Sequence, residues 1–209
     1  ELVCQRTEAS RTALVALLEG ALLGGVLLCL RSRGRGPDRE GDAAFLQVDV
    51  EDEVEVDQDG IDKDAGASTL RSRITAQSGS LHGFTVLGEV DNVTVVGSEK
   101  YNSTENGKTR YPVVADPSGT EVNQVYLKYT ADSANGIYGR QRINYGNQRF
   151  VGGVAWRQNE QTFDGFRANW QLVDSVSLDY SYTYRVHRVF GPDDGTFPAE
   201  WDGDNHFAY

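Results

Sequence analysis

The 209-residue sequence contains no methionine and only two cysteines, and both of them, Cys4 and Cys29, precede Leu30. Without cysteine from Leu30 onward, the main body of the chain cannot form a disulfide scaffold or a cysteine-rich zinc site. Because the first residue is not methionine, we expect a processed or cut N-terminus. Because the closing residues 206–209 resemble the opening of another strand, we expect the chain to be a fragment.

Basic residues are scarce: 20 Lys and Arg stand against 31 Asp and Glu, for a formal net charge of −11. This balance argues against nucleic-acid binding, which requires a basic surface. Motifs that define catalytic geometry are also missing: there is no Gly-x-Ser-x-Gly and no phosphate-binding glycine loop, and His82, His187 and His206 show no metal-ligand spacing. We therefore predict no enzymatic activity, no cofactor, no metal site and no nucleic-acid partner.

Long apolar runs are absent after Leu30, which excludes a helical membrane protein from there on. The one such run, Ala13–Leu30, has arginines on both sides and Glu19 inside it. Two interpretations stay open, a degraded signal region or membrane anchor, and a poorly ordered or helical extension. We predict that residues 1–43 form an atypical N-terminal extension ending in a linker at 34–41, and that 44–209 form the main body.

What the main body does contain is alternation of apolar and polar residues with a period of two, which is typical of strands with unlike faces. It is cleanest over Val176–His187, where valine, leucine and tyrosine alternate with serine, threonine and charged residues. Similar alternation predicts further strands at 45–56, 70–77, 84–91, 124–130, 137–144 and 166–171. No helical period appears. The prediction is an all-β fold with about seven strands and the start of an eighth.

The connections between these strands alternate between long and short. Long segments are expected at 57–68, 93–122, 146–161 and 191–205, and short turns at 78–80, 131–136 and 173–175. In an up-and-down meander, this pattern places every long connection at the same end of the sheet. Outer-membrane barrels have short periplasmic turns and long outer loops, and cross the bilayer with strands of about 9–11 residues. We therefore predict an antiparallel up-and-down transmembrane β-barrel, of which this chain forms a part of seven to eight strands.

If the apolar faces meet lipid, the polar faces line a lumen. The cations predicted there, as contacts for the solute, are Arg71, Arg73, Lys128, Arg140, Arg142, Arg149, Arg157, Arg167 and Arg185. Arg149 and Arg157 fall in the glycine-rich loop after the fifth strand, which we expect to narrow the pore. Rings of arginine and lysine select anions. Alternatively, these cations pair with Glu89, Asp91 and Asp179 and brace the barrel interior.

Two further features have alternative interpretations. The acidic clusters of the loops are interpreted as solvated turns rather than as a calcium site, because their spacing does not follow the EF-hand pattern. These residues are Asp57, Asp59, Asp62, Asp64, Asp193, Asp194, Asp202 and Asp204.

The aromatic residues permit a second function, a secreted β-rich carbohydrate-binding module with Trp156, Trp170 and Tyr182 as sugar platforms. A soluble module should not keep one face of Val176–Val186 apolar. A third possibility is that the fragment has no independent function, because its open sheet exposes edges.

From about Val56 to Tyr209 the sequence resembles the alginate export family of outer-membrane porins. The resemblance rests on four segments: VDQDGIDKDAGASTLRSR (56–73), YPVVADPSGTEVNQVYL (111–127), GRQRINYGNQRFVGGVAWRQNEQTFDGF (139–166) and RVFGPDDG (188–195). It implies a large, arginine-rich barrel in the bacterial outer membrane. Its partners would be outer-membrane lipid and an anionic polysaccharide or small anionic solute, which would pass through without a cofactor. The acidic stretch Gln47–Glu55 departs from the basic and aromatic first strand of the family.

Overall fold

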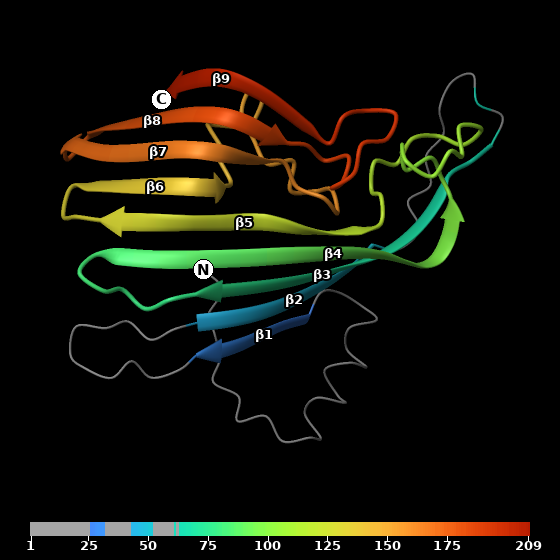
Figure 1. Ribbon diagram of the computed structural model, residues 1–209, viewed down its shortest axis with the longest axis horizontal. Helices are drawn as coiled ribbons and strands as arrows, with labels where there is room; N and C mark the ends of the chain where they lie inside the picture. The colour runs from blue at the N-terminus through green and yellow to red at the C-terminus, as the bar shows by residue number, and fades with distance from the viewer. Residues whose placement is uncertain (1–25, 32–42, 52–60, 62) are drawn as a thin grey trace.

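The computed structural model describes Val26–Arg31, Ala43–Glu51, residue 61 and residues 63–209, with the first two segments described by their backbone alone. Nine strands form one antiparallel sheet in which every strand pairs with its neighbours in sequence, from β1 at one edge to β9 at the other (Figure 1). The strands are β1 (Val26–Arg31), β2 (Ala43–Glu51), β3 (Gly66–Gln77), β4 (Phe84–Lys100), β5 (Gly119–Thr130), β6 (Ala134–Gln141), β7 (Thr162–Val173), β8 (Val176–His187) and β9 (Glu200–Ala208).

The predicted fold class, an all-β antiparallel up-and-down sheet forming part of a barrel, is confirmed. The predicted bounds of β8 match the structure, since apolar and polar residue types alternate in the sequence over the whole of this strand. Within the described ranges, no helix has the length and apolar character needed to span a bilayer.

Apart from β8, the strands differ from their predicted extents: β3, β5 and β7 begin four or five residues earlier, and β6 lies three residues earlier. Three differences are larger. β4 continues to Lys100, beyond the expected end at Asp91, because its second half pairs with the start of β3 although valines occur on both of its faces. β9 begins at Glu200 within an expected loop. Val26–Arg31, part of the apolar run expected to be a signal, an anchor or an extension, pairs with β2 as a strand. The rest of that run, the linker at 34–41, and Asp57, Asp59 and Asp62 lie outside the described residues.

The connections sort by length as the sequence predicts. Short turns at 78–83, 131–133 and 174–175 lie at the left end of the sheet in Figure 1, and the long connections 101–118, 142–161 and 188–199 lie at the right end. The two ends therefore differ, with compact turns at one and folded loops at the other.

The two faces of the sheet reverse the pattern of a soluble protein. One face exposes large apolar side chains, among them Ile74, Val86, Val90, Val125, Leu127, Tyr138, Phe166, Trp170, Leu178 and Tyr184. The opposite face buries polar ones, among them Thr69, Arg73, Glu89, Asp91, Gln124, Asp179, Ser181 and Thr183. We call them the apolar face and the polar face. Exposed apolar surface of this extent indicates an interaction with a membrane or a partner.

Two small hydrophobic clusters form where the long connections fold over the polar face. One joins Ala65, Ala67, Tyr101 and Val114, so that the 101–118 connection packs on the start of β3. The other joins Ile143, Val151 and Phe163, within and beside the 142–161 connection. These clusters hold both connections against the sheet.

Candidate functional site

A cluster of buried charges occupies the polar face of β3 and β4. The antiparallel register places Arg73 directly opposite Asp91, and its Nε and Nη2 atoms donate to the two carboxylate oxygens at 2.7 and 2.6 Å. Glu89, two residues before Asp91 on the same face, lies 3.5 Å from Arg73 Nε. Both carboxylates are buried, at 1% exposure for Asp91 and 4% for Glu89. A buried guanidinium needs this bidentate partner, because an unpaired one would be very costly to desolvate.

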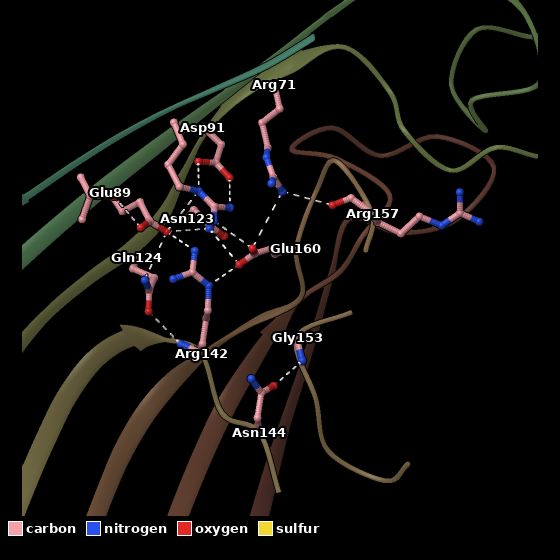
Figure 2. A network of polar contacts seen from close by, with 12 residues as sticks. Arg71, Glu89, Asp91, Asn123, Gln124, Arg142, Asn144, Gly153, Arg157 and Glu160 are labelled. Atoms are coloured by element: carbon pink, nitrogen blue, oxygen red, sulfur yellow. Dashed lines mark hydrogen bonds and ion pairs between the residues drawn. The ribbon is translucent and has the colours of Figure 1, made fainter. Parts of the chain in front are cut away.

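The 142–161 connection reaches this cluster through Glu160. Its carboxylate lies 2.9 Å from Arg73 Nη1 and 3.9 Å from Arg71 Nη1, and it also pairs with Arg142 (Figure 2). Two residues earlier, the Gln158 amide donates to Thr69 Oγ1 at 3.0 Å. The connection joins β6 to β7 but bonds to β3, so it crosses the polar face of β5 and β4 on the way. Ion pairs and amide bonds thus fasten it across the polar face.

A β-bulge in β5 supplies the amides that complete the cluster. The register shifts between Glu89 and Val90 on β4, so Asn123 and Gln124 both turn toward the polar face and are buried. Their amide nitrogens donate to Glu89 Oε1 at 2.9 and 3.2 Å. The Gln124 oxygen in turn accepts from the backbone N–H of Arg142 at 3.1 Å. A bulge places consecutive side chains on one face, which regular alternation cannot do.

The 101–118 connection joins the same assembly through Asp116. Its carboxylate is buried, accepts from the Gln158 backbone N–H at 2.9 Å, and lies 3.3 Å from Arg157 Nη1. Arg71 Nη1 donates to the backbone carbonyl of Arg157 at 3.2 Å. Two connections and three strands therefore meet around a shared set of polar side chains, which we call the loop-anchoring network. Its members are Arg71, Arg73, Glu89, Asp91, Asp116, Asn123, Gln124, Arg142, Arg157, Gln158 and Glu160.

The two loop carboxylates of this network differ in pKa. Burial alone would raise the pKa of Glu160, but the charges of Arg142 and Arg73 and their hydrogen bonds outweigh it and lower the pKa below its ordinary value. Burial raises the pKa of Asp116 despite the hydrogen bond from Gln158 and the charge of Arg157. Glu160 is therefore a stable anion at neutral pH, whereas Asp116 ionises less readily.

A second buried group lies on the polar face of β7 and β8. Arg167 Nε donates to Asp179 Oδ1 at 2.9 Å, and its Nη2 donates to Oδ2 at 2.5 Å. The hydroxyl of Tyr145 donates to the same carboxylate at 2.7 Å, and its ring lies under the Arg167 guanidinium at 5.4 Å. The Arg167–Asp179 pair agrees with the alternative interpretation, in which Asp179 is one of the acidic partners of the lumen cations.

Arg140 and Arg185 do not lie on the polar face, which corrects their predicted lumen position. Arg140 pairs in register with the exposed Val125 and with Asp164, and Asp164 pairs with Arg185. Paired residues share a face, so this row lies on the apolar face. A register shift between Thr183 and Arg185 reverses the alternation of β8, a bulge that the sequence pattern does not reveal. Arg140 lies 2.9 Å from Asp164, and Arg185 lies 2.7 Å from Asp202.

Lys128 and Arg149 are the predicted cations for which the described residues provide no carboxylate within ion-pair distance. Lys128 lies on the polar face of β5, and Ile137 of β6 separates it in register from Arg167. Arg149 is exposed in the 142–161 connection. Each of the other seven predicted cations has at least one carboxylate within ion-pair distance; these are Arg71, Arg73, Arg140, Arg142, Arg157, Arg167 and Arg185. Pairing on this scale favours the bracing interpretation for most of the arginines.

Sequence reasoning missed Glu160, Asp116 and Asp164 as partners, and Asn123 and Gln124 as ligands of Glu89. Glu160 and Asp116 belong to connections, where no periodicity indicates which way a side chain points. The neighbouring Asn123 and Gln124 break the alternation of β5, and this break is the signal that could have located the bulge.

Other predicted sites are dispersed. Trp156 lies in the 142–161 connection, whereas Trp170 and Tyr182 lie on β7 and β8, so the three aromatic residues proposed as sugar platforms come from separate elements. Among the residues that the structure describes, no group of three or more His, Cys, Asp or Glu side chains is placed to hold a metal ion.

Comparison with known proteins gives one match. The family model for alginate export matches residues 45–186, which span nearly all of β2 and continue almost to the end of β8. Neither a curated protein nor a solved structure matches the chain. The matched range contains every member of the loop-anchoring network.

Proposed function

Since this chain belongs to the alginate export family, we propose that it forms part of an outer-membrane β-barrel channel in a bacterium. Anionic solutes, such as alginate-like polysaccharide or oligosaccharide, would pass through it passively and without a cofactor. On this proposal the apolar face meets outer-membrane lipid and the polar face lines the lumen. The protein is then a transport protein and not an enzyme.

The observation that carries this proposal is the reversal of the two faces. A sheet in water buries its apolar side chains, yet here Tyr138 is 62% exposed while Asp91, on the opposite face, is 1% exposed. Inside a bilayer the same arrangement is favourable, because lipid solvates the apolar face and an up-and-down sheet satisfies its backbone groups between strands. The separation of long connections from short turns supports the same interpretation.

The cations of the polar face divide into two roles on this proposal. Arg71 and Arg73 are buried, and their carboxylate partners hold the 142–161 connection inside the channel. Lys128 and Arg149, which lack such partners among the described residues, meet the passing anion. Arg142, with 27% of its side chain exposed, borders both groups. A guanidinium that is paired on one side keeps further N–H donors for a solute carboxylate.

Ion selectivity tests this assignment. The full-length channel with both Lys128→Gln and Arg149→Gln should show a smaller anion-to-cation permeability ratio, because two positive charges leave the path. Arg140→Gln with Arg185→Gln is the matched control, because it also removes two positive charges but from the apolar face. An unchanged ratio in the first double variant, or an equal fall in the control, would contradict the assignment.

A further inference from the structure

The apolar face contains a groove with a volume of about 380 Å³ at its short-turn end. Its floor is the register row in which Gly136 of β6 lies between Tyr129 of β5 and Ala168 of β7. A row of bulky side chains, including Tyr138 and Phe166, borders this floor on one side. Small residues between bulky rows produce a trough that runs across the strands.

The walls of the groove suit hydrocarbon. None of its lining residues is charged, and Phe84, Leu127 and Trp170 contribute apolar or aromatic surface. A polysaccharide or an anionic solute would find no guanidinium or ammonium group there. The groove also lies over β4–β7, away from both edge strands of the sheet, so strands added at the edges to close a barrel would leave it open to the outside.

Position and charge narrow the occupant to one class of lipid. The groove continues the surface that meets lipid on the proposed function, and it lies at the end with short turns, which face the periplasm in bacterial barrels. The periplasmic leaflet of the outer membrane consists of glycerophospholipid. Two exposed carboxylates lie on turns at this end of the sheet: Asp132 on the 131–133 turn, which the lining residues Ala131 and Ala134 flank, and Asp174 on the 174–175 turn after β7. Neither turn contains lysine or arginine. This charge complements an ammonium headgroup and opposes an anionic one.

We propose that the groove binds one acyl chain of a zwitterionic glycerophospholipid, with the ammonium group of its headgroup beside Asp132 and Asp174. The inference rests on the proposed function, because only a membrane-embedded sheet presents this groove to lipid. It adds a specific lipid site on the outside of the channel, separate from the solute path on the polar face.

The structure provides a matched pair of variants to test this site. A Cβ added at Gly136 would meet the Phe166 ring at 3.6 Å, an ordinary contact, so Gly136→Leu fills the groove without displacing backbone. Gly88→Leu is the control: Gly88 pairs with Val125 on the same apolar face, lies outside the groove, and has no atom within 4 Å of an added Cβ. Both variants add the same apolar side chain to the same face.

The full-length protein should be purified from nanodiscs that contain phosphatidylethanolamine or phosphatidylglycerol, and its retained lipids counted by native mass spectrometry. We expect one retained phosphatidylethanolamine per chain in the wild type and in Gly88→Leu, and about tenfold lower occupancy in Gly136→Leu. Asp132→Asn with Asp174→Asn should reduce the preference for phosphatidylethanolamine over phosphatidylglycerol.

The outcomes separate this inference from the proposed function. If all variants insert into nanodiscs but retain equal numbers of lipids, the lipid site is refuted and the channel proposal stands. If Gly136→Leu instead dissociates an oligomer without loss of lipid, a second copy occupies the groove and the inference is wrong. If the wild type does not insert, the proposed function fails together with the inference.

Discussion

Glu160→Gln tests whether the loop-anchoring network holds the 142–161 connection in place. The Glu160 side chain is 3% exposed and lies between Arg73 and Arg142. The amide group of glutamine would direct an N–H₂ donor at guanidinium donors, and it carries no charge to neutralise them. The variant changes few atoms, so its effect reports the lost charge rather than a lost volume.

The size of the effect follows from the partners that remain. Removing one member of a buried ion pair costs about 3–5 kcal/mol when its partner is left uncompensated. Here Arg73 keeps Asp91, and Arg142 keeps Glu89, so the cost falls to about 2–3 kcal/mol. Since about 1.4 kcal/mol corresponds to a factor of ten, the population with the connection released should rise roughly 30- to 150-fold.

Hydrogen exchange of the amides in residues 143–158 measures this population in the reconstituted protein. Glu160→Gln should accelerate exchange there by the same factor and leave the amides of β7 and β8 unchanged. Glu99→Gln is the control, because the Glu99–Lys108 pair is exposed and such pairs contribute only about 0–1 kcal/mol. Equal exchange rates in the wild type and Glu160→Gln would refute the reasoning that charge fastens this connection.

Three further predictions concern the two loop carboxylates and the close approach of β6 to β5. Asp116→Asn should accelerate amide exchange in the connection by less than about threefold, because burial already disfavours the charged form of Asp116 and an amide oxygen can still accept from the Gln158 backbone N–H. An acceleration as large as that of Glu160→Gln would contradict this prediction. The folded-state pKa of Glu160 is lowered below 4.5, so its contribution to fastening the connection should be complete above that pH and lost only as pH falls through the lowered pKa. Amide exchange in the connection, corrected for its intrinsic pH dependence, should therefore stay constant from about pH 7 to 5. A loss of protection within that range would count against the assignment. Gly139→Ala should destabilise the folded protein by at least ~2 kcal/mol, because φ is +126° and the added Cβ would lie 2.3 Å from the Val125 carbonyl oxygen. Gly88→Ala is the control, because its added Cβ meets no atom within 4 Å. If the two variants show the same heat-modifiable electrophoretic mobility across a denaturant series, the prediction is refuted.

The sequence predicted the sheet well where alternation is regular. β8 shows this best: its apolar and polar residues alternate over its whole length, and its bounds match. The order and direction of the strands followed from the alternation of long and short connections. β4 was predicted too short because its second half carries apolar residues on both faces, and tertiary pairing with β3 decides its length.

The site was predicted in part. Arg73 and Arg167 lie on the polar face, as alternation predicted, because both follow regular strand positions. Arg185 was placed on the wrong face, because β8 has one more residue than β7 between Thr183 and Arg185, and the polarity pattern does not change there. Glu160 was missed, because it pairs with Arg73 across 87 residues of chain, and no local pattern encodes so distant a contact.

The most direct test of the channel is the single-channel conductance of the full-length protein in planar bilayers, with its reversal potential in a salt gradient. We predict an anion-selective current that uronate oligomers block and that needs no cofactor. A protein that remains soluble without detergent and conducts no current would contradict the central claim.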